Sequence, residues 1–211
     1  MEKGAVKDLA EKLRKGKITS DEARRELRKR GLGHEEGWKD FIGYVVWGIL
    51  CFLPGVAKLT GLEILSFFAQ LPTMKFPPII IYFSIALFIA MIPLAVSQYY
   101  FNSRRGGCDH EDHTVILFEN GPYGIVRHPG VLSFTVFLVT VPIILSGVVP
   151  FTILSAIAIV EIIAYSYYEC VVEERTLNIP KWGDKYREYM KEVPRFNFIL
   201  GIWRWAKKKK R

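Results

Sequence analysis

The chain has 211 residues, half of them apolar, and its formal net charge at pH 7 is +8. Of its 29 Lys and Arg residues, 12 lie in residues 1–40 and 12 in residues 172–211, so an apolar middle separates two charged ends. A soluble nucleic-acid-binding protein gathers its cations on a face of the fold instead. The composition therefore argues against a nucleic-acid partner and predicts an integral membrane protein in contact with membrane lipids.

The first 33 residues predict two short amphipathic helices that are joined at Gly16. A capping box of Thr19 and Glu22 is expected to begin the second helix. The pattern resembles a small oligomerisation-type domain in which a Gly-x-Ile-Thr turn joins two helices, and a solvated hairpin without a partner is the alternative. We expect a cytosolic helical hairpin over residues 1–36, which could form a homo-oligomer, and a membrane-embedded domain over residues 37–211.

Four apolar segments predict helices that cross a membrane. Residues 61–71 are too short to cross and predict an interfacial or re-entrant segment, which leaves a fifth span open. The expected fold class is all-α, a polytopic membrane bundle of four to five transmembrane helices with a C-terminal helical hairpin and cytosolic helical tails. The four segments are residues 41–57, 78–100, 131–149 and 151–172, and the last two form the hairpin.

The distribution of cations predicts the orientation of these spans. With four spans, the two tails and the loop at residues 101–130 share one side and hold 27 Lys and Arg residues, whereas the other side holds two. Both termini are therefore expected in the cytosol. The sequence Ile202-Trp203-Arg204-Trp205, followed by five basic residues at 207–211, predicts an interfacial anchor on anionic lipid.

Acidic side chains inside the last apolar segment indicate a functional face. Glu161, Tyr165, Glu169 and Glu173 recur every four residues and so share one side of a helix. Charged groups in a span are costly, so this side should line a polar cavity or a bundle interface rather than lipid. For Glu161, a structural hydrogen bond to a neighbouring span is the alternative.

The loop before the third span ends in Arg127-His128-Pro129. Proline suits the first turn of a helix, and the N-terminus of a helix beside an arginine attracts an anionic group such as a carboxylate. A proline-capped helix start with a snorkelling arginine is the alternative.

Four sequence blocks together resemble the isoprenylcysteine carboxyl methyltransferase and phospholipid methyltransferase superfamily over about residues 78–198. The order and the spacing of the blocks agree with that superfamily, as does the helical hairpin between the first two. The blocks are Tyr123-x-x-x-Arg127-His128-Pro129, Glu173-Glu174-x-x-Leu177, Trp182-Gly183-x-x-Tyr186-x-x-Tyr189 and Val193-Pro194-Arg195-Phe196.

The resemblance implies an enzyme that uses S-adenosyl-L-methionine in a pocket on the cytosolic side of the bundle. Arg127 and Glu174 would be its catalytic residues, with the glutamate pairing the cofactor's ammonium while Arg127 or backbone amides receive its carboxylate. Transfer from a sulfonium depends mainly on positioning and on the exclusion of water. The implied cofactor-binding residues are Val115, Ile116, Leu117, Phe118, Tyr123, His128, Pro129, Gly130, Val131, Glu173 and Glu174.

The resemblance also implies a lipidic or lipidated acceptor, and three positions depart from the superfamily pattern. Val131 and Ser133 replace a Tyr and a Gly, and Cys170 stands where the isoprenylcysteine enzymes have an Arg that receives the substrate carboxylate. A phospholipid headgroup amine is therefore an acceptor comparable to a prenylcysteine carboxylate. The implied substrate residues are Glu161, Tyr165, Glu169 and Cys170.

Two classes of protein other than a methyltransferase fit parts of the pattern. A sterol-reductase-like enzyme would use NADPH but has more spans, and a non-catalytic membrane adaptor would need no cofactor. The segment Cys-Asp-His-Glu-Asp-His at residues 108–113 is rich in potential metal ligands, but it lacks a second ligand pair elsewhere. We expect an acidic loop there and no metal site.

Overall fold

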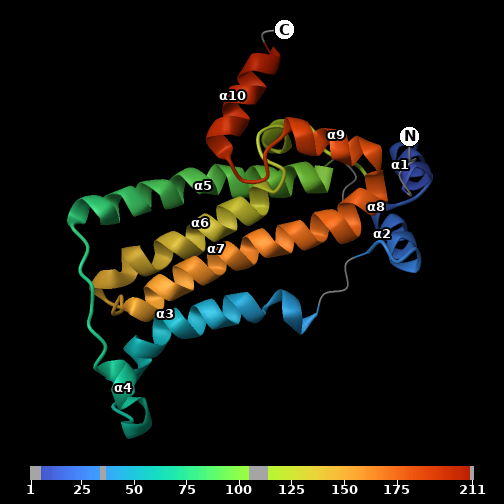
Figure 1. Cartoon of the computed structure of the whole chain (residues 1–211). Helices are drawn as coiled ribbons and strands as arrows, with labels where there is room; N and C mark the ends of the chain where they lie inside the picture. Colours follow the sequence, from blue (N-terminus) through green and yellow to red (C-terminus); the bar gives the residue numbers. More distant parts are fainter. Residues whose placement is uncertain (1–5, 34–36, 105–113, 210–211) are drawn as a thin grey trace. The chain divides into compact units, whose positions relative to one another are not determined.

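The computed structural model describes residues 6–33, 37–104 and 114–209, and every regular element in these residues is helical (Figure 1). The prediction of the all-α fold class is therefore confirmed for these residues. Two compact units interleave along the chain. The bundle unit consists of residues 36–93 and 133–169, and the site unit consists of the described parts of residues 1–35, 94–132 and 170–211.

Four helices in the described residues are long and apolar enough to cross a membrane, as predicted. Residues 61–71 form only a 3-10 turn, Glu63–Leu65, and the four-residue helix α4, Ser66–Ala69, so this segment is too short to cross. The orientation of the termini remains a prediction. The candidate spans are Ile42–Thr60, Pro78–Gln98, Pro129–Gly147 and Ile153–Trp182.

Proline and glycine set the limits of the spanning helices. Helices α5 (Pro78–Arg104) and α6 (Pro129–Ile144) both begin at a proline, whose fixed φ and missing N–H suit the first helical position. Helix α3 (Ile42–Thr60) ends at Gly61, which takes the left-handed conformation at φ 62° and returns its N–H to the carbonyl of Ala57. Helix α7 spans Ile153–Glu173.

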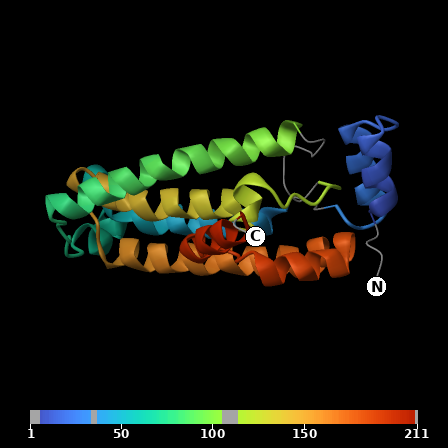
Figure 2. The same ribbon diagram turned by 90° about the horizontal axis from the view of Figure 1, so that it is seen from above.

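Helices α3, α6 and α7 run side by side in the bundle unit, as Figures 1 and 2 both show. Trp47 and Cys51 of α3 are buried against Ala158 and Ile162 of α7. The ring of Tyr44 on α3 makes edge contacts with Phe134 and Tyr165, at centroid distances of 5.4 and 5.5 Å. These apolar and aromatic contacts form the core of the bundle unit.

The outer surface of the bundle unit is strongly apolar. Only 6% of the candidate span Pro78–Gln98 is buried, and Ile79 and Phe83 of this span are 73% and 67% exposed. Soluble proteins rarely expose contiguous apolar surface of this extent, whereas a bilayer solvates it. The exposure therefore supports the prediction of a membrane protein.

The N-terminal hairpin consists of α1 (Lys7–Arg14) and α2 (Ser20–Lys29). The predicted capping box is present: Thr19 Oγ1 accepts a hydrogen bond from the Glu22 N–H, and Glu22 Oε2 accepts one from the Thr19 N–H. Arg30 donates two hydrogen bonds to Asp8, at 2.9 and 2.8 Å, and this pairing lowers the pKa of Asp8 to about 2. Whether the hairpin also folds as a separate domain stays a prediction.

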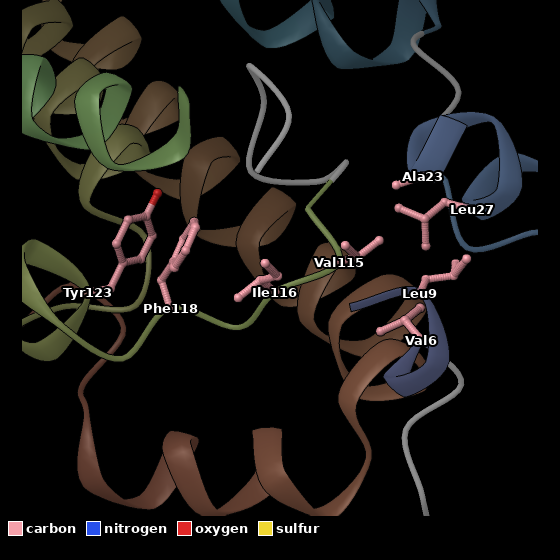
Figure 3. Packing of buried hydrophobic residues seen from close by; sticks show 8 residues of the cluster. All are labelled: Val6, Leu9, Ala23, Leu27, Val115, Ile116, Phe118 and Tyr123. Atoms are coloured by element: carbon pink, nitrogen blue, oxygen red, sulfur yellow. The ribbon is translucent and has the colours of Figure 1, made fainter. Parts of the chain in front are cut away.

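The apolar side of the hairpin is buried within the site unit. Val6 and Leu27 pack with Val115, which lies in the extended segment before the 3-10 turn Gly121–Gly124. The backbone N–H of Val6 also points to the carbonyl of Lys181, at 3.4 Å. Homo-oligomer formation through this hairpin stays a prediction. Figure 3 shows the buried cluster, which comprises Val6, Leu9, Ala23, Leu27, Val115, Ile116, Phe118 and Tyr123.

The C-terminal part of the site unit is a series of short helices. Tyr186, Tyr189 and Val193 form a buried core against which Ile179 and Trp182 pack. The helices are α8 (Ile179–Trp182), α9 (Asp184–Glu192) and α10 (Phe198–Lys209).

Candidate functional site

The backbone places Arg127 and His128 directly before α6. The turn Gly121–Gly124 precedes them, and the N–H of Arg127 donates a hydrogen bond to the carbonyl of Pro194, at 3.0 Å. Pro129 then begins α6, as the sequence predicted. The two side chains are consequently held near the start of a helix, and His128 is fully buried.

Glu174 lies at the centre of a buried cluster of charges. Its Oε1 is 3.0 Å from His128 Nε2 and 3.0 Å from Arg127 Nε, and Arg195 contacts both carboxylate oxygens, at 3.2 and 2.5 Å. The Glu174 side chain is only 1% exposed. Arg127 also donates a hydrogen bond to the carbonyl of Met190, at 2.9 Å, which fixes its guanidinium. The structure thus brings Glu173 and Glu174 into contact with Arg127 and His128, although His128 and Glu174 are 46 residues apart in the sequence.

A π-helical turn, Glu174–Asn178, continues α7 at this cluster. Within it, Asn178 donates hydrogen bonds to Glu173, at 2.7 Å, and to the hydroxyl of Tyr186, at 3.3 Å. π-turns are rare and occur often at functional sites. At the start of this turn, Glu173 and Glu174 both lie close to His128, at 3.5 and 3.0 Å.

The electrostatic surroundings of His128 favour its protonated form. Complete burial alone lowers the pKa of His128, but Glu173, Cys170 and Glu174 act against it, and the pKa lies well above its usual value. Its Nδ1 is 3.5 Å from Glu173 Oε2. The ring thus lies within contact distance of both glutamates, with its Nε2 3.0 Å from Glu174.

The predicted cofactor segment lies next to this cluster, but little free volume remains beside it. Among the described residues, a cavity of about 20 Å³ is bounded by Ile116, Leu117, Phe118 and Tyr123 together with Arg127 and Asn178. This volume holds about one water molecule. The Oδ1 of Asn178 has no hydrogen-bond partner in the described part of the chain, and the Nε of Arg127 makes only its 3.0 Å ion-pair contact with Glu174 there.

These observations test how well S-adenosyl-L-methionine fits the site. The charged groups suit the methionine end, because two guanidiniums, a histidine and two carboxylates match a zwitterion, and the unpaired Oδ1 of Asn178 belongs to a residue that lines the cavity. The free volume does not fit the whole molecule, since ligand pockets measure about 300–1,000 Å³. Binding would require the chain around the cavity to open.

The remaining cofactor residues surround the same region. Val115 accepts a hydrogen bond from the indole of Trp182, at 3.2 Å, and so connects the segment to α8. Gly130 faces the side chain of Gln98, which a Cβ at this position would meet. Val131 is the next residue of α6 and is partly buried.

The predicted substrate residues divide between the two units. In the bundle unit, Tyr165 donates a hydrogen bond to the carbonyl of Lys39, at 2.6 Å, and Tyr44 donates one to Glu169, at 3.1 Å. These contacts place Tyr165 and Glu169 at a helix interface, one of the two expected environments. Glu161 has one buried oxygen without a hydrogen-bond partner in the described residues.

Cys170 belongs to the site unit instead. It is 1% exposed and contacts His128, close to Glu174, as its spacing of one helical turn predicted. The position is therefore part of the buried charge cluster.

Arg195 and Asn178 were not predicted as site residues from the sequence. For Arg195, the only indication in the sequence is its place in the fourth sequence block. Asn178 lies four residues after Glu174, a spacing that places two residues on the same side of a regular helix. Their partners could not be identified without the tertiary structure.

A large open groove of about 750 Å³ adjoins this region between α9, α10 and the turn at Gly121–Gly124. Tyr189 lines both the groove and the small cavity, and its hydroxyl donates a hydrogen bond to the carbonyl of Tyr123, at 2.6 Å. Tyr189 thus separates the small cavity from the groove.

The segment at residues 108–113 lies outside the described residues. In the part of the chain that the structure describes, no group of three or more His, Cys, Asp or Glu side chains is arranged to hold a metal ion. Comparisons with protein families, with curated proteins and with solved structures find no match to this chain.

Proposed function

We propose that this chain is a membrane-embedded methyltransferase that binds S-adenosyl-L-methionine beside the Glu174 cluster. The supporting observation is the 3.0 Å contact between His128 and Glu174. His128 and Glu174 belong to sequence blocks that are far apart in the chain. A structural role for each block alone would not require their side chains to be in contact.

The geometry suggests a division of roles within the cluster. Glu174 already compensates Arg127, His128 and Arg195, so we assign it to positioning these cations. Arg127 or Arg195 would then receive a carboxylate. Glu173, whose side chain is 15% exposed, is the more accessible carboxylate for an ammonium group.

When bound, the cofactor would supply a methyl group on a sulfonium for transfer to a nucleophilic oxygen or nitrogen of the acceptor. The chain would contribute orientation and exclusion of water, which matter most for such a transfer. Opening would separate the segment around Ile116 from Trp182 and Tyr186, the aromatic walls of the small cavity.

The acceptor is most like the lipidic acceptors of the isoprenylcysteine enzymes, and a phospholipid headgroup amine is the second candidate. The environment of Cys170 favours the amine, because a buried thiol cannot hold a substrate carboxylate in the bidentate way that an arginine can. An NADPH-dependent reductase and a non-catalytic adaptor are the proposals from other classes.

The acceptor can be identified by radiolabelled methyl transfer with the reconstituted full chain. We expect more transfer to phosphatidylethanolamine than to a farnesylated cysteine analogue. More efficient methylation of the carboxylate would contradict the argument from Cys170, and would assign the carboxylate to Arg127 or Arg195. Absence of transfer to either acceptor, with cofactor binding intact, would favour an acceptor of another chemistry.

A further inference from the structure

Helix α10 has one side docked on the site unit. A Cβ at Gly201 would collide with the carbonyl oxygen of Ile125, so only glycine allows this close approach. Arg204 donates hydrogen bonds to the carbonyls of Lys191 and Glu192 at the C-terminal end of α9, both at 3.2 Å. The interaction of a cation with the carbonyls at a helix C-terminus is favourable, and it fixes α10 against α9.

The opposite side of α10 exposes large apolar side chains. Ile199, Ile202 and Trp203 are 83%, 42% and 58% exposed. Their spacing of three and one residues places them on one face of the helix. Lys207 lies 5.3 Å from the ring of Trp203 and begins a run of five basic residues.

The groove of about 750 Å³ lies beside this face and is basic overall. Five Lys and Arg residues and three Glu residues line it, together with Trp203, Trp205 and Tyr189. Two of the glutamates pair with two of these lysines, Glu119 with Lys185 at 2.9 Å and Glu192 with Lys208 at 2.8 Å, so the remaining cations still outnumber the remaining glutamate. An anionic group with an apolar part therefore complements the groove better than a neutral or cationic one.

The position of α10 in the chain relates it to the membrane boundary. Ile125, on which Gly201 packs, lies four residues before Pro129, where a candidate span begins. Four residues reach at most about 14 Å, so this contact lies near the end of the span. Tryptophan, isoleucine and lysine in this combination are typical of a helix at the headgroup level.

We propose that α10 and the adjoining groove form a binding surface for anionic phospholipid of the bilayer. Ile199, Ile202 and Trp203 enter the interfacial region, and the cations of the groove and of residues 207–209 bind the lipid phosphates. Anionic lipid then holds α10 against the loop that leads to Arg127 and His128. The proposal does not depend on the methyltransferase activity.

The test uses the full chain in nanodiscs of phosphatidylcholine with and without phosphatidylglycerol. Amide hydrogen exchange in residues 198–209 should be at least about tenfold slower with phosphatidylglycerol, since each basic residue near an anionic surface contributes about fivefold in affinity. The difference should vanish when Lys207, Lys208, Lys209, Lys210 and Arg211 are all replaced by glutamine.

A matched control replaces five cations of the hairpin by glutamine and should keep the difference, because the total charge change is the same. The control residues are Lys7, Lys12, Arg14, Lys15 and Lys17. Equal exchange in the two kinds of nanodisc would overturn the proposal. Protection by inorganic phosphate alone in the neutral nanodiscs would also overturn it, because the groove would then bind a soluble anion.

Discussion

Replacement of Glu174 by glutamine is expected to lower the free energy of unfolding by about 3–5 kcal/mol, because it leaves buried cations without their counter-ion. Glu174 is 1% exposed and contacts Arg127, His128 and Arg195 at 2.5–3.2 Å. Removal of one partner from a buried ion pair costs more than the pair contributes, since the remaining charge stays desolvated. Denaturant titration of the detergent-solubilised protein measures the effect.

Two further variants separate this effect from a general loss of charge. Glu173→Gln should have a smaller effect, because that side chain is more exposed. The double variant Glu174→Gln, Arg195→Gln should be less destabilised than the sum of the two single variants, since it removes a carboxylate together with one of its cations. Wild-type stability of Glu174→Gln would mean that the charges of the cluster are compensated in another way.

Leu27→Ala is expected to lower the stability of the docked hairpin by about 2–5 kcal/mol, the usual range for a buried leucine. Leu27 is fully buried, and its cluster includes Val6 and Val115. Because this packing connects the hairpin to the site unit, we expect local detachment before global unfolding. Faster amide hydrogen exchange in α1, in α2 and at Val115 would report the detachment.

Arg25→Ala on the same helix provides the control, because its side chain is exposed and alanine favours a helix. It should leave hydrogen exchange at Val115 unchanged. If Leu27→Ala accelerated exchange in α1 and α2 but not at Val115, the packing between the hairpin and this segment would be refuted.

The spanning helices could be predicted because hydropathy and helix-start signals are local. Pro78 and Pro129 begin α5 and α6 as expected, and the capping box at Thr19 forms. The period of four in Glu161, Tyr165 and Glu169 also predicted polar surroundings for this side of the helix, and the last two make hydrogen bonds there. It could not identify Tyr44 and Lys39 as their partners, because that requires the packing of α3 on α7.

The candidate site was predicted in part. Motif residues with fixed spacing, such as His128 and Glu174, could be named, but their mutual contact depends on the tertiary fold. The π-turn after Glu173 has no local sequence signal, and within it Asn178 donates a hydrogen bond to Glu173, five residues earlier. The burial of Leu27 against Val115 likewise depends on residues 88 positions apart, beyond any helical period.

Titration of the purified full chain with S-adenosylhomocysteine tests the central claim, a methyl-donor site beside the Glu174 cluster, most directly. We predict saturable binding of S-adenosylhomocysteine and none of NADPH. Glu173→Gln should weaken the binding about tenfold or more, the effect of losing one charge-assisted hydrogen bond, while Lys12→Gln on the exposed side of α1 should leave it unchanged. Binding of NADPH instead, or binding of neither ligand, would contradict the claim.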